Sequence, residues 1–466
     1  MRNGLEFFQP FFHLCRSQIL FQSQLQPQFL VFGMAAKALT LQETFKMKKI
    51  SALIIAIIAI AFPAHAQNKP YSIVTCPGED VSQQINISWA SDTSQKADYI
   101  LYTIANDVNW KRAKKSSGES HLCRTFDSIY SKTADNQNFY EKVVFNKYGA
   151  VLKKLKPGTE YMYKIISSGR NESVIHYFKT AGPNTWSAAI ISDFHHYTPL
   201  PHRLEAAVAM LDTIKSYDPD IDWILHLGDV CAWGGSYSFW RTLYEQDYFS
   251  KYMWAGVNGN HDNMTRKYFL SSAFFRDANN YPSNGYTGEE GVCYFFKYSN
   301  ALFIILNNED MHTDEQLNAA QNWVRKVVAK NPSKYIIVCE HYQWFYGENG
   351  KFSQYSRWCN LFDELGVDLA LAANNHIYVR TNALYNGKET DGTKGTVYVQ
   401  TPSSDNERGM DADTLKYNLD IIKYRWTEGA KTVGGLSLKA NNKTLTINLL
   451  NRYGKILDSV AIKAKR

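Results

Sequence analysis

Short apolar runs that end in potential metal-binding residues recur through the second part of the chain and limit what it can fold into. Five of these runs end in Asp, His or Asn, and stretches with helical spacing at 204–217, 313–330 and 354–365 separate several of them. The runs occupy residues 186–193, 222–229, 252–262, 300–309, 334–341 and 367–376. Alternating strands and helices predict an α/β domain with mainly parallel neighbouring strands. Because ligands gather beyond the carboxyl ends of such strands, the polar groups are expected to converge on one edge.

Each polar group at a strand end has an ordinary structural explanation when it is taken alone. Asp193 and His195 could belong to a strand-end turn, and Asp229 could close another turn. His341 could be a partly buried histidine whose ring is satisfied by hydrogen bonds. The segment 259–262, Gly-Asn-His-Asp, is denser in ligand groups than a plain loop needs. The joint order of these groups, each at a predicted strand end, indicates a site rather than a set of turns.

This order of motifs resembles the calcineurin-like metallophosphoesterase superfamily, whose series is D-x-H, G-D, G-N-H-[DE], a separate His, and G-H-x-H. The matching positions are Asp193-Phe194-His195, Gly228-Asp229, Gly259-Asn260-His261-Asp262, His341 and Ala373-Asn374-Asn375-His376. The resemblance spans residues from about 187 to 410. It implies a metal-dependent hydrolase of phosphate esters, built as an α+β sandwich of two mixed sheets flanked by helices.

The resemblance also implies two metal ions and a role for each motif residue. The implied ligands of the first ion are Asp193, His195, Asp229 and His376. Asp229 would bridge to the second ion, whose other implied ligands are Asn260, His341 and Asn374. A metal-bridging hydroxide would be the nucleophile, and His261 would protonate the leaving oxygen or stabilise the transition state. Oxygen and imidazole donors suit Mn, Fe or Zn.

Two positions depart from the family pattern. Purple acid phosphatases have a tyrosine three residues after the bridging aspartate, where this chain has Ala232. We therefore expect no tyrosinate-to-iron absorption band and no purple colour. Asn374 stands where the family usually has histidine, and an amide oxygen is a weaker and harder donor than imidazole. The second ion is therefore expected to bind more loosely or to tolerate Mn or Mg.

Side chains beside the motifs are candidates for contacts with substrate. His196 and Tyr342 each follow a predicted ligand, and Arg380 could pair with a phosphoryl oxygen. A surface arginine on a returning strand explains Arg380 equally well.

A region of short alternating runs comes before the α/β pattern, and we assign it to residues 67–182. Segments 84–91 and 98–105 predict strands, and 155–167 has a Pro-Gly turn followed by alternating apolar residues. This pattern resembles an all-β fibronectin type III sandwich, with Trp89 in the core and Tyr161 as the corner tyrosine. A fibronectin-like domain before the phosphoesterase motifs, predicted over 183–466, resembles the purple acid phosphatase arrangement. The domain is expected to be a packing spacer, with a carbohydrate-binding or adhesive role as the alternative.

The first 66 residues are expected to be absent from the mature protein. Residues 47–66 combine two lysines, an apolar run and an Ala-His-Ala cleavage pattern, which together are typical of a secretory signal peptide. Residues 1–46 then result from an upstream start codon. The mature chain would be exported to the periplasm, the cell surface or the medium, without a membrane anchor. Cys76 and Cys123 could pair there, and no CxxC metal pattern is present.

The sequence therefore predicts an exported two-metal phosphoesterase that acts on a phosphorylated small molecule or ester. The domain arrangement favours a phosphomonoesterase by analogy, and a phosphodiesterase or nucleotide pyrophosphatase is the alternative. A phosphatase-like surface binding protein without activity is a third possibility, and Asn374 is the only residue that supports it. The charge balance gives no reason to expect a nucleic-acid partner. The oligomeric state stays open.

Overall fold

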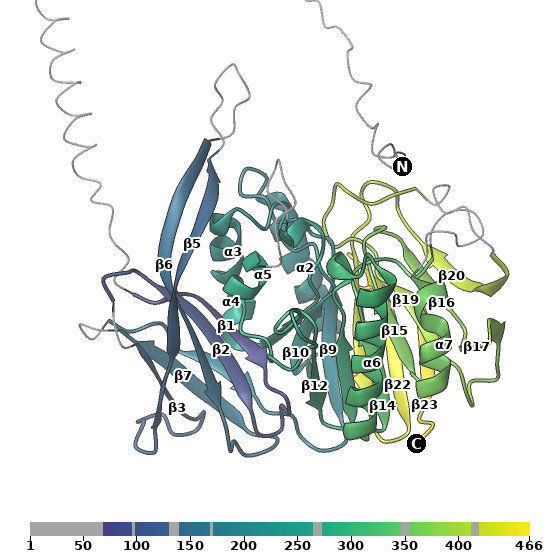
Figure 1. Ribbon diagram of the computed structural model, residues 1–466, viewed down its shortest axis with the longest axis horizontal. Helices are drawn as coiled ribbons and strands as arrows, with labels where there is room; N and C mark the ends of the chain where they lie inside the picture. The colour runs from purple at the N-terminus through teal and green to yellow at the C-terminus, as the bar shows by residue number, and fades with distance from the viewer. Residues whose placement is uncertain are drawn as a thin grey trace, which may run out of the picture. The chain divides into compact units, whose positions relative to one another are not determined.

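The computed structural model describes most of the chain after the proposed signal peptide (Figure 1). The described residues are 69–95, 98–129, 139–167, 171–263, 273–345, 354–411 and 419–466. The expected upstream segment 1–46 and the expected signal peptide 47–66 lie outside them. Among the described residues, no helix has the length and apolar character needed to cross a membrane.

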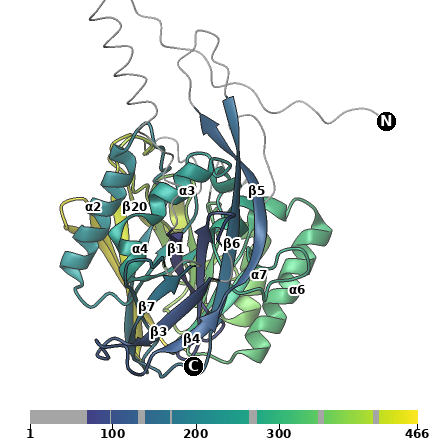
Figure 2. The same ribbon diagram turned by 90° about the vertical axis from the view of Figure 1, so that its left-hand side faces the viewer.

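The N-terminal region is an all-β sandwich of two four-stranded antiparallel sheets, as the sequence predicted. The first sheet contains β1 (Tyr71–Pro77), β2 (Ile85–Ser91), β6 (Phe139–Leu152) and β5 (Glu119–Ile129), in this spatial order. The second contains β4 (Lys114–Ser117), β3 (Tyr99–Ile104), β7 (Glu160–Ile166) and β8 (His176–Lys179). Figure 2 shows β5 and β6 running side by side as a long hairpin.

The expected core residues hold this sandwich together. Trp89 is fully buried and stacks on Tyr148 with ring centroids 5.2 Å apart. The hydroxyl of Tyr161 accepts a hydrogen bond from the backbone N–H of Lys156 at 3.0 Å, which is the corner geometry that the sequence predicted.

Two mixed sheets pack face to face in the second region. The six-stranded sheet has the order β11 (Met253–Gly256), β10 (Trp223–His226), β9 (Trp186–Ile191), β21 (Gly434–Ala440), β22 (Thr444–Asn451), β23 (Ile456–Lys463). The seven-stranded sheet has the order β12 (Tyr294–Tyr298), β13 (Ala301–Ile305), β14 (Tyr335–Cys339), β15 (Leu369–Ala372), β19 (Val397–Gln400), β16 (Tyr378–Thr381), β20 (Ile422–Trp426). Strands β9 to β11 are parallel, as are β13, β14, β15 and β19. The rings of Trp223 and Phe303, one from each sheet, meet at 5.0 Å in the core.

Helices cover the outer faces of both sheets. Helix α2 (His202–Tyr217) packs against β9 and β21, and Figure 1 shows α6 (Asp314–Lys330) and α7 (Tyr355–Leu365) on the seven-stranded sheet. Thr313 and Gln316 form a capping box at the start of α6, and Gly366 ends α7 with a φ of +65°. The remaining elements are α3 (Tyr237–Tyr244), α4 (Asp247–Lys251), η1 (His261–Asn263), α5 (Ala273–Ala278), η2 (Asn308–Asp310), β17 (Leu384–Tyr385), β18 (Lys388–Glu389) and η5 (Leu419–Ile421). The predicted sandwich of two mixed sheets flanked by helices is confirmed.

Candidate metal centre

The predicted ligands follow the carboxyl ends of the parallel strands, and the backbone there is strained. Five of these residues have a φ between +42° and +67°, a region that non-glycine residues seldom occupy. They are Asp193, His195, Asp229, Asn374 and His376. Left-handed residues of this kind concentrate at functional sites, where the surrounding structure holds them in place. The turns therefore direct five side chains toward one point rather than simply reversing the chain.

Two glycines leave the space that these side chains fill. A Cβ on Gly259 would lie 2.3 Å from Asp229 Oδ1, and a Cβ on Gly228 would lie 2.5 Å from His341 Nδ1. Gly228 also has a φ of +96°. The Gly-Asp and Gly-Asn motifs thus need glycine because the ligand side chains pack directly against the backbone.

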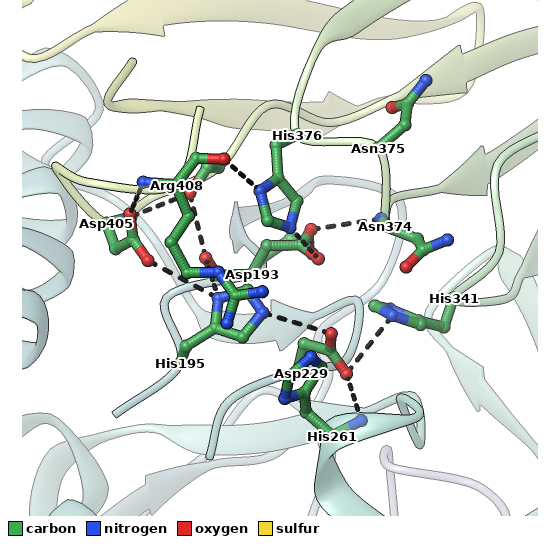
Figure 3. A network of polar contacts seen from close by, with 12 residues as sticks. Asp193, His195, Asp229, His261, His341, Asn374, Asn375, His376, Asp405 and Arg408 are labelled. Carbon is green, nitrogen blue, oxygen red and sulfur yellow. Dashed lines mark hydrogen bonds and ion pairs between the residues drawn. The ribbon is translucent and has the colours of Figure 1, made fainter. Parts of the chain in front are cut away.

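Asp229 lies between two imidazoles at the centre of the cluster (Figure 3). Its Oδ2 is 3.2 Å from His195 Nε2, and its Oδ1 is 3.3 Å from His341 Nε2. Asp193 Oδ1 lies 3.4 Å from His376 Nε2. The two carboxylates and the imidazoles of His195, His341 and His376 are all buried. The structure therefore brings the five charged or imidazole ligands of the prediction together.

The three imidazoles present the same nitrogen to the carboxylates. In each ring Nδ1 lies within hydrogen-bond distance of a backbone carbonyl oxygen, so we assign the N–H to Nδ1. The acceptors are the carbonyls of Asp193, Leu227 and Arg408. A neutral ring in this tautomer turns the Nε2 lone pair toward a carboxylate oxygen. An Nε2 lone pair and a carboxylate oxygen that face each other repel unless a proton or a metal ion lies between them. In metal sites, a hydrogen bond from Nδ1–H to a carbonyl oxygen orients histidine ligands in the same way.

The electrostatics of the cluster also indicate a place for positive charge. Burial raises the pKa of Asp229, but the imidazoles of His341 and His261 outweigh burial and hold this pKa well below its usual range. Burial lowers the pKa of His341, whereas the Asp229 carboxylate raises it, with a net value of about 10. The cluster therefore favours a cation, whether protons on the rings or metal ions between the ligands.

Two amide side chains lie on the side of the cluster assigned to the second ion. Asn260 Oδ1 is 3.2 Å from His341 Nε2. The Nδ2 group of Asn374 donates to Gln343 Oε1 at 2.6 Å, which fixes the amide so that its oxygen is turned toward His341 (Figure 3). Asn375 points away from the cluster. Asn374 is thus placed to offer an oxygen donor where the family has an imidazole.

His261 approaches the cluster from η1 and is held by the segment that follows Asp229. Its Nδ1 lies 2.8 Å from the carbonyl oxygen of Ala232, and its backbone N–H donates to Asp229 Oδ1 at 2.8 Å. This carbonyl is the orienting partner that the sequence left unidentified. Burial, the largest cause, lowers the pKa of His261 to about 4, so the ring is neutral at neutral pH. A phosphate anion beside it would oppose this effect of burial.

Asp262 is a structural support rather than a ligand. Its two carboxylate oxygens accept hydrogen bonds at 2.9 to 3.1 Å from four backbone N–H groups in the turns that carry the ligands. The donors are Asp229, Val230, Cys231 and Gly259. Burial, followed by the charge of Asp229, raises the pKa of Asp262, whereas the hydrogen bonds that it accepts from backbone N–H groups lower it. This one side chain therefore ties the turn after β10 to the turn after β11.

The loop after β19 supplies two residues that the sequence analysis missed. Asp405 Oδ2 lies 3.5 Å from His195 Nδ1, and its Oδ1 accepts the backbone N–H of Arg408 at 2.8 Å. The Arg408 side chain folds back beside His195 (Figure 3), and its charge interacts with the carboxylates of Asp229, Asp405 and Asp193. No hydrogen bond or ion pair to another described residue engages its guanidinium. Asp405 lies in the loop after strand β19, just as the recognised ligands follow their strands, and this position was the available signal.

Two of the three expected substrate contacts are corrected by the structure. His196 is buried and packs against Phe239, and its ring nitrogens have no hydrogen-bond partner among the described residues. Burial lowers its pKa to about 4. Arg380 is also buried, and its Nη2 donates to Asp458 Oδ1 at 2.9 Å. Both side chains belong to the protein interior. Tyr342 stays near the cluster, where its ring lies 5.7 Å from that of His341.

Comparisons with known proteins agree with this geometry. Residues 187–378 match the family model of the calcineurin-like phosphoesterases, and residues 70–180 match that of the purple acid phosphatase N-terminal domain. The structure is similar to purple acid phosphatase PPD1 from yellow lupin (Lupinus luteus) seeds, with a TM-score of 0.67 and 17% identity over 86% of this chain and 75% of that chain. It is also similar to PhoD, with a TM-score of 0.54 and 12% identity over 84% and 89% of the two chains. No curated protein matches the sequence. At these identities the structural matches establish a shared fold.

Proposed function

We propose that this metal-dependent phosphoesterase is an exported two-metal phosphomonoesterase. The proposal is supported by the match of residues 187–378 to the family model of the calcineurin-like phosphoesterases. The observation that carries the two-metal part is the set of Nε2 lone pairs turned toward the carboxylates of Asp193 and Asp229. Each ring is held in that tautomer by a backbone carbonyl, so the geometry is built for a cation between the donors.

The donor set divides into two groups around Asp229. The proposed ligands of the first ion are Asp193, His195, Asp229 and His376. The proposed ligands of the second ion are Asp229, Asn260, His341 and Asn374. Oxygen and imidazole donors of this kind fit Mn, Fe or Zn. Two bound ions would supply a nucleophile from water near neutral pH and would neutralise charge on the phosphoryl group.

The protein's own side chains have separate tasks around these ligands. His261 is oriented by the Ala232 carbonyl, which leaves its Nε2 available to share a proton with the leaving oxygen. Arg408 is proposed to bind a phosphoryl oxygen, because its guanidinium lies beside His195 and no described residue pairs with it. A phosphomonoester is doubly charged near neutral pH, so this additional cation favours a monoester over a singly charged diester.

The activity is tested on the metal-stripped protein reloaded separately with Mn, Zn or Fe. We expect hydrolysis of p-nitrophenyl phosphate to exceed that of bis-p-nitrophenyl phosphate, and we expect Asp229→Asn and His261→Ala to lower it strongly. Faster hydrolysis of the bis-ester would identify a phosphodiesterase. No hydrolysis with any of the metals would favour a phosphatase-like binding protein. Activity unchanged by Asp229→Asn would disprove the ligand assignment.

Export is the second part of this proposal and rests on the leader pattern in residues 47–66. The expected mature N-terminus is Gln67. Sequencing the N-terminus of the protein recovered outside the cytoplasm checks this directly. An intact segment 47–66 in that protein would contradict cleavage at this position.

A further inference from the structure

A second group of metal-binding side chains lies outside the proposed phosphoesterase centre, where the sandwich strand β5 meets α5. His121 and Cys123 are alternate residues of β5, so they point to the same face of the strand. Asp277 comes from α5, about 150 residues further along the chain. Cys76 and Cys123, which the sequence suggests as a possible disulfide pair, are both free cysteines.

Two of the three separations between the donor atoms match those between ligands of one ion. His121 Nε2 lies 3.3 Å from Cys123 Sγ and 3.5 Å from Asp277 Oδ1, and all three donor atoms lie within 4.8 Å of one another. With Zn–S bonds of ~2.3 Å and Zn–N or Zn–O bonds of ~2.0 Å, a tetrahedral zinc ion separates its ligand atoms by ~3.3–3.6 Å. The two measured distances fall in this range.

We propose that His121, Cys123 and Asp277 form a zinc site that links β5 of the sandwich to α5 of the phosphoesterase region. A thiolate is a soft ligand, so the site would select zinc over the hard ions Mg, Ca and Mn. Three protein ligands leave the fourth position for water. His121 also lines a cavity of about 770 Å³.

The surroundings allow a metal ion to enter. The side chains of His121 and Asp277 are 64% and 30% exposed, so an ion can approach them from solvent. Cys123 is buried next to these two ligands, and an ion held by them can reach its sulfur. Burial, followed by the charge of Asp277, raises the pKa of the Cys123 thiol to about 12. The thiol is therefore protonated without metal, and zinc binding would release its proton to solvent.

The position of α5 gives this site a structural consequence. Helix α5 packs against η1, the short turn that carries His261. An ion bound by Asp277 would connect the sandwich to the helix that supports His261. The inference does not depend on the proposed phosphatase activity, because its ligands and its test are separate from that centre.

The test uses Co²⁺ as a spectroscopic substitute for zinc in the full-length protein already loaded with Mn²⁺. A thiolate–cobalt bond gives a near-ultraviolet charge-transfer band, and the described ligands of the phosphoesterase centre include no thiolate. We expect about one equivalent of Co²⁺ to produce the band and Zn²⁺ to remove it. Cys123→Ser should abolish the band, whereas Cys359→Ser, at a half-buried cysteine elsewhere, should retain it.

His121→Gln separates metal binding from folding, because the largely exposed side chain can change without disturbing the core. We expect this variant to keep the wild-type unfolding temperature measured without metal and to lose cobalt affinity. No band in the wild-type protein at saturating Co²⁺ would overturn the proposal. A band that persists in Cys123→Ser would overturn it as well, since the sulfur donor would then be elsewhere.

Discussion

Two arginines of the phosphoesterase region should respond to substitution in opposite ways. The guanidinium of Arg408 lies beside His195 with no hydrogen-bond or ion-pair partner in the described part of the chain, whereas Arg380 is buried against Asp458. We predict that Arg408→Gln impairs catalysis and leaves stability nearly unchanged. We predict the reverse for Arg380→Met, which removes the charge but keeps an apolar stem of similar length.

The magnitudes follow from what each guanidinium contacts. A hydrogen bond from a charged donor to a phosphoryl oxygen contributes about 1.5–3 kcal/mol, so Arg408→Gln should lower kcat/KM roughly 10- to 150-fold. Arg380→Met leaves the buried carboxylate of Asp458 without its cation, and removal of one partner from a buried ion pair costs about 3–5 kcal/mol. A loss of this size should lower the unfolding temperature by roughly 5 °C or more.

The assay is steady-state hydrolysis of p-nitrophenyl phosphate together with thermal unfolding of each variant. Arg408→Lys is the conservative control and should recover part of the lost kcat/KM, because it restores the charge without the planar geometry. Equal unfolding temperatures for wild type and Arg380→Met would refute the assignment of the buried ion pair. Wild-type kcat/KM in Arg408→Gln would refute the role of Arg408 in substrate binding, whatever its stability.

Three further predictions concern the supports of the centre and the sandwich core. Asn374→His should tighten the second ion roughly tenfold in a metal titration, and unchanged affinity would mean that Asn374 is not a ligand. Asp262→Asn leaves two of four backbone N–H groups without an acceptor. It should therefore lower the free energy of unfolding by about 2–4 kcal/mol in chemical denaturation and weaken metal binding. A wild-type free energy of unfolding together with wild-type metal affinity would contradict the supporting role of Asp262. His176 is buried against Tyr163, and burial lowers its pKa to about 4, below the ~6.5 of the unfolded chain. The unfolded state therefore binds more protons between these values, and wild-type stability should fall by up to about 3 kcal/mol relative to His176→Phe as the pH drops from about 6.5 to 4. Parallel pH profiles of unfolding for the two proteins would disprove this account.

Much of the second region was predictable because its signals are local. Apolar runs end where strands end, and the helices predicted at 204–217, 313–330 and 354–365 closely match α2, α6 and α7. The candidate ligands are recognisable because parallel strands place their carboxyl ends at one edge. The proximity of ligands in short motifs after such strands can therefore be predicted even when the loop conformations are unknown.

The flanking side chains were less predictable because their roles depend on contacts distant in the sequence. Arg380 follows a motif residue by four positions, but its partner Asp458 comes from β23. Arg408 comes from a loop with no periodic pattern and reaches the site through a turn held by Asp405. His196 directly follows a ligand, yet it lies in the core. Adjacency to a motif is therefore a poor guide to contact with substrate.

The supports of the centre differ in how far they depend on residue type. The structure uses the carbonyl of residue 232, not its side chain, to hold His261. The carbonyl of Leu227 holds His341 in the same way. A backbone carbonyl is present whatever the residue type, so such support places no requirement on the sequence. The side-chain supports differ, because only a residue with a carboxylate can accept the four N–H groups that Asp262 joins. The orientation of the imidazoles is therefore tolerant of substitution, whereas the joining of the two turns depends on one residue.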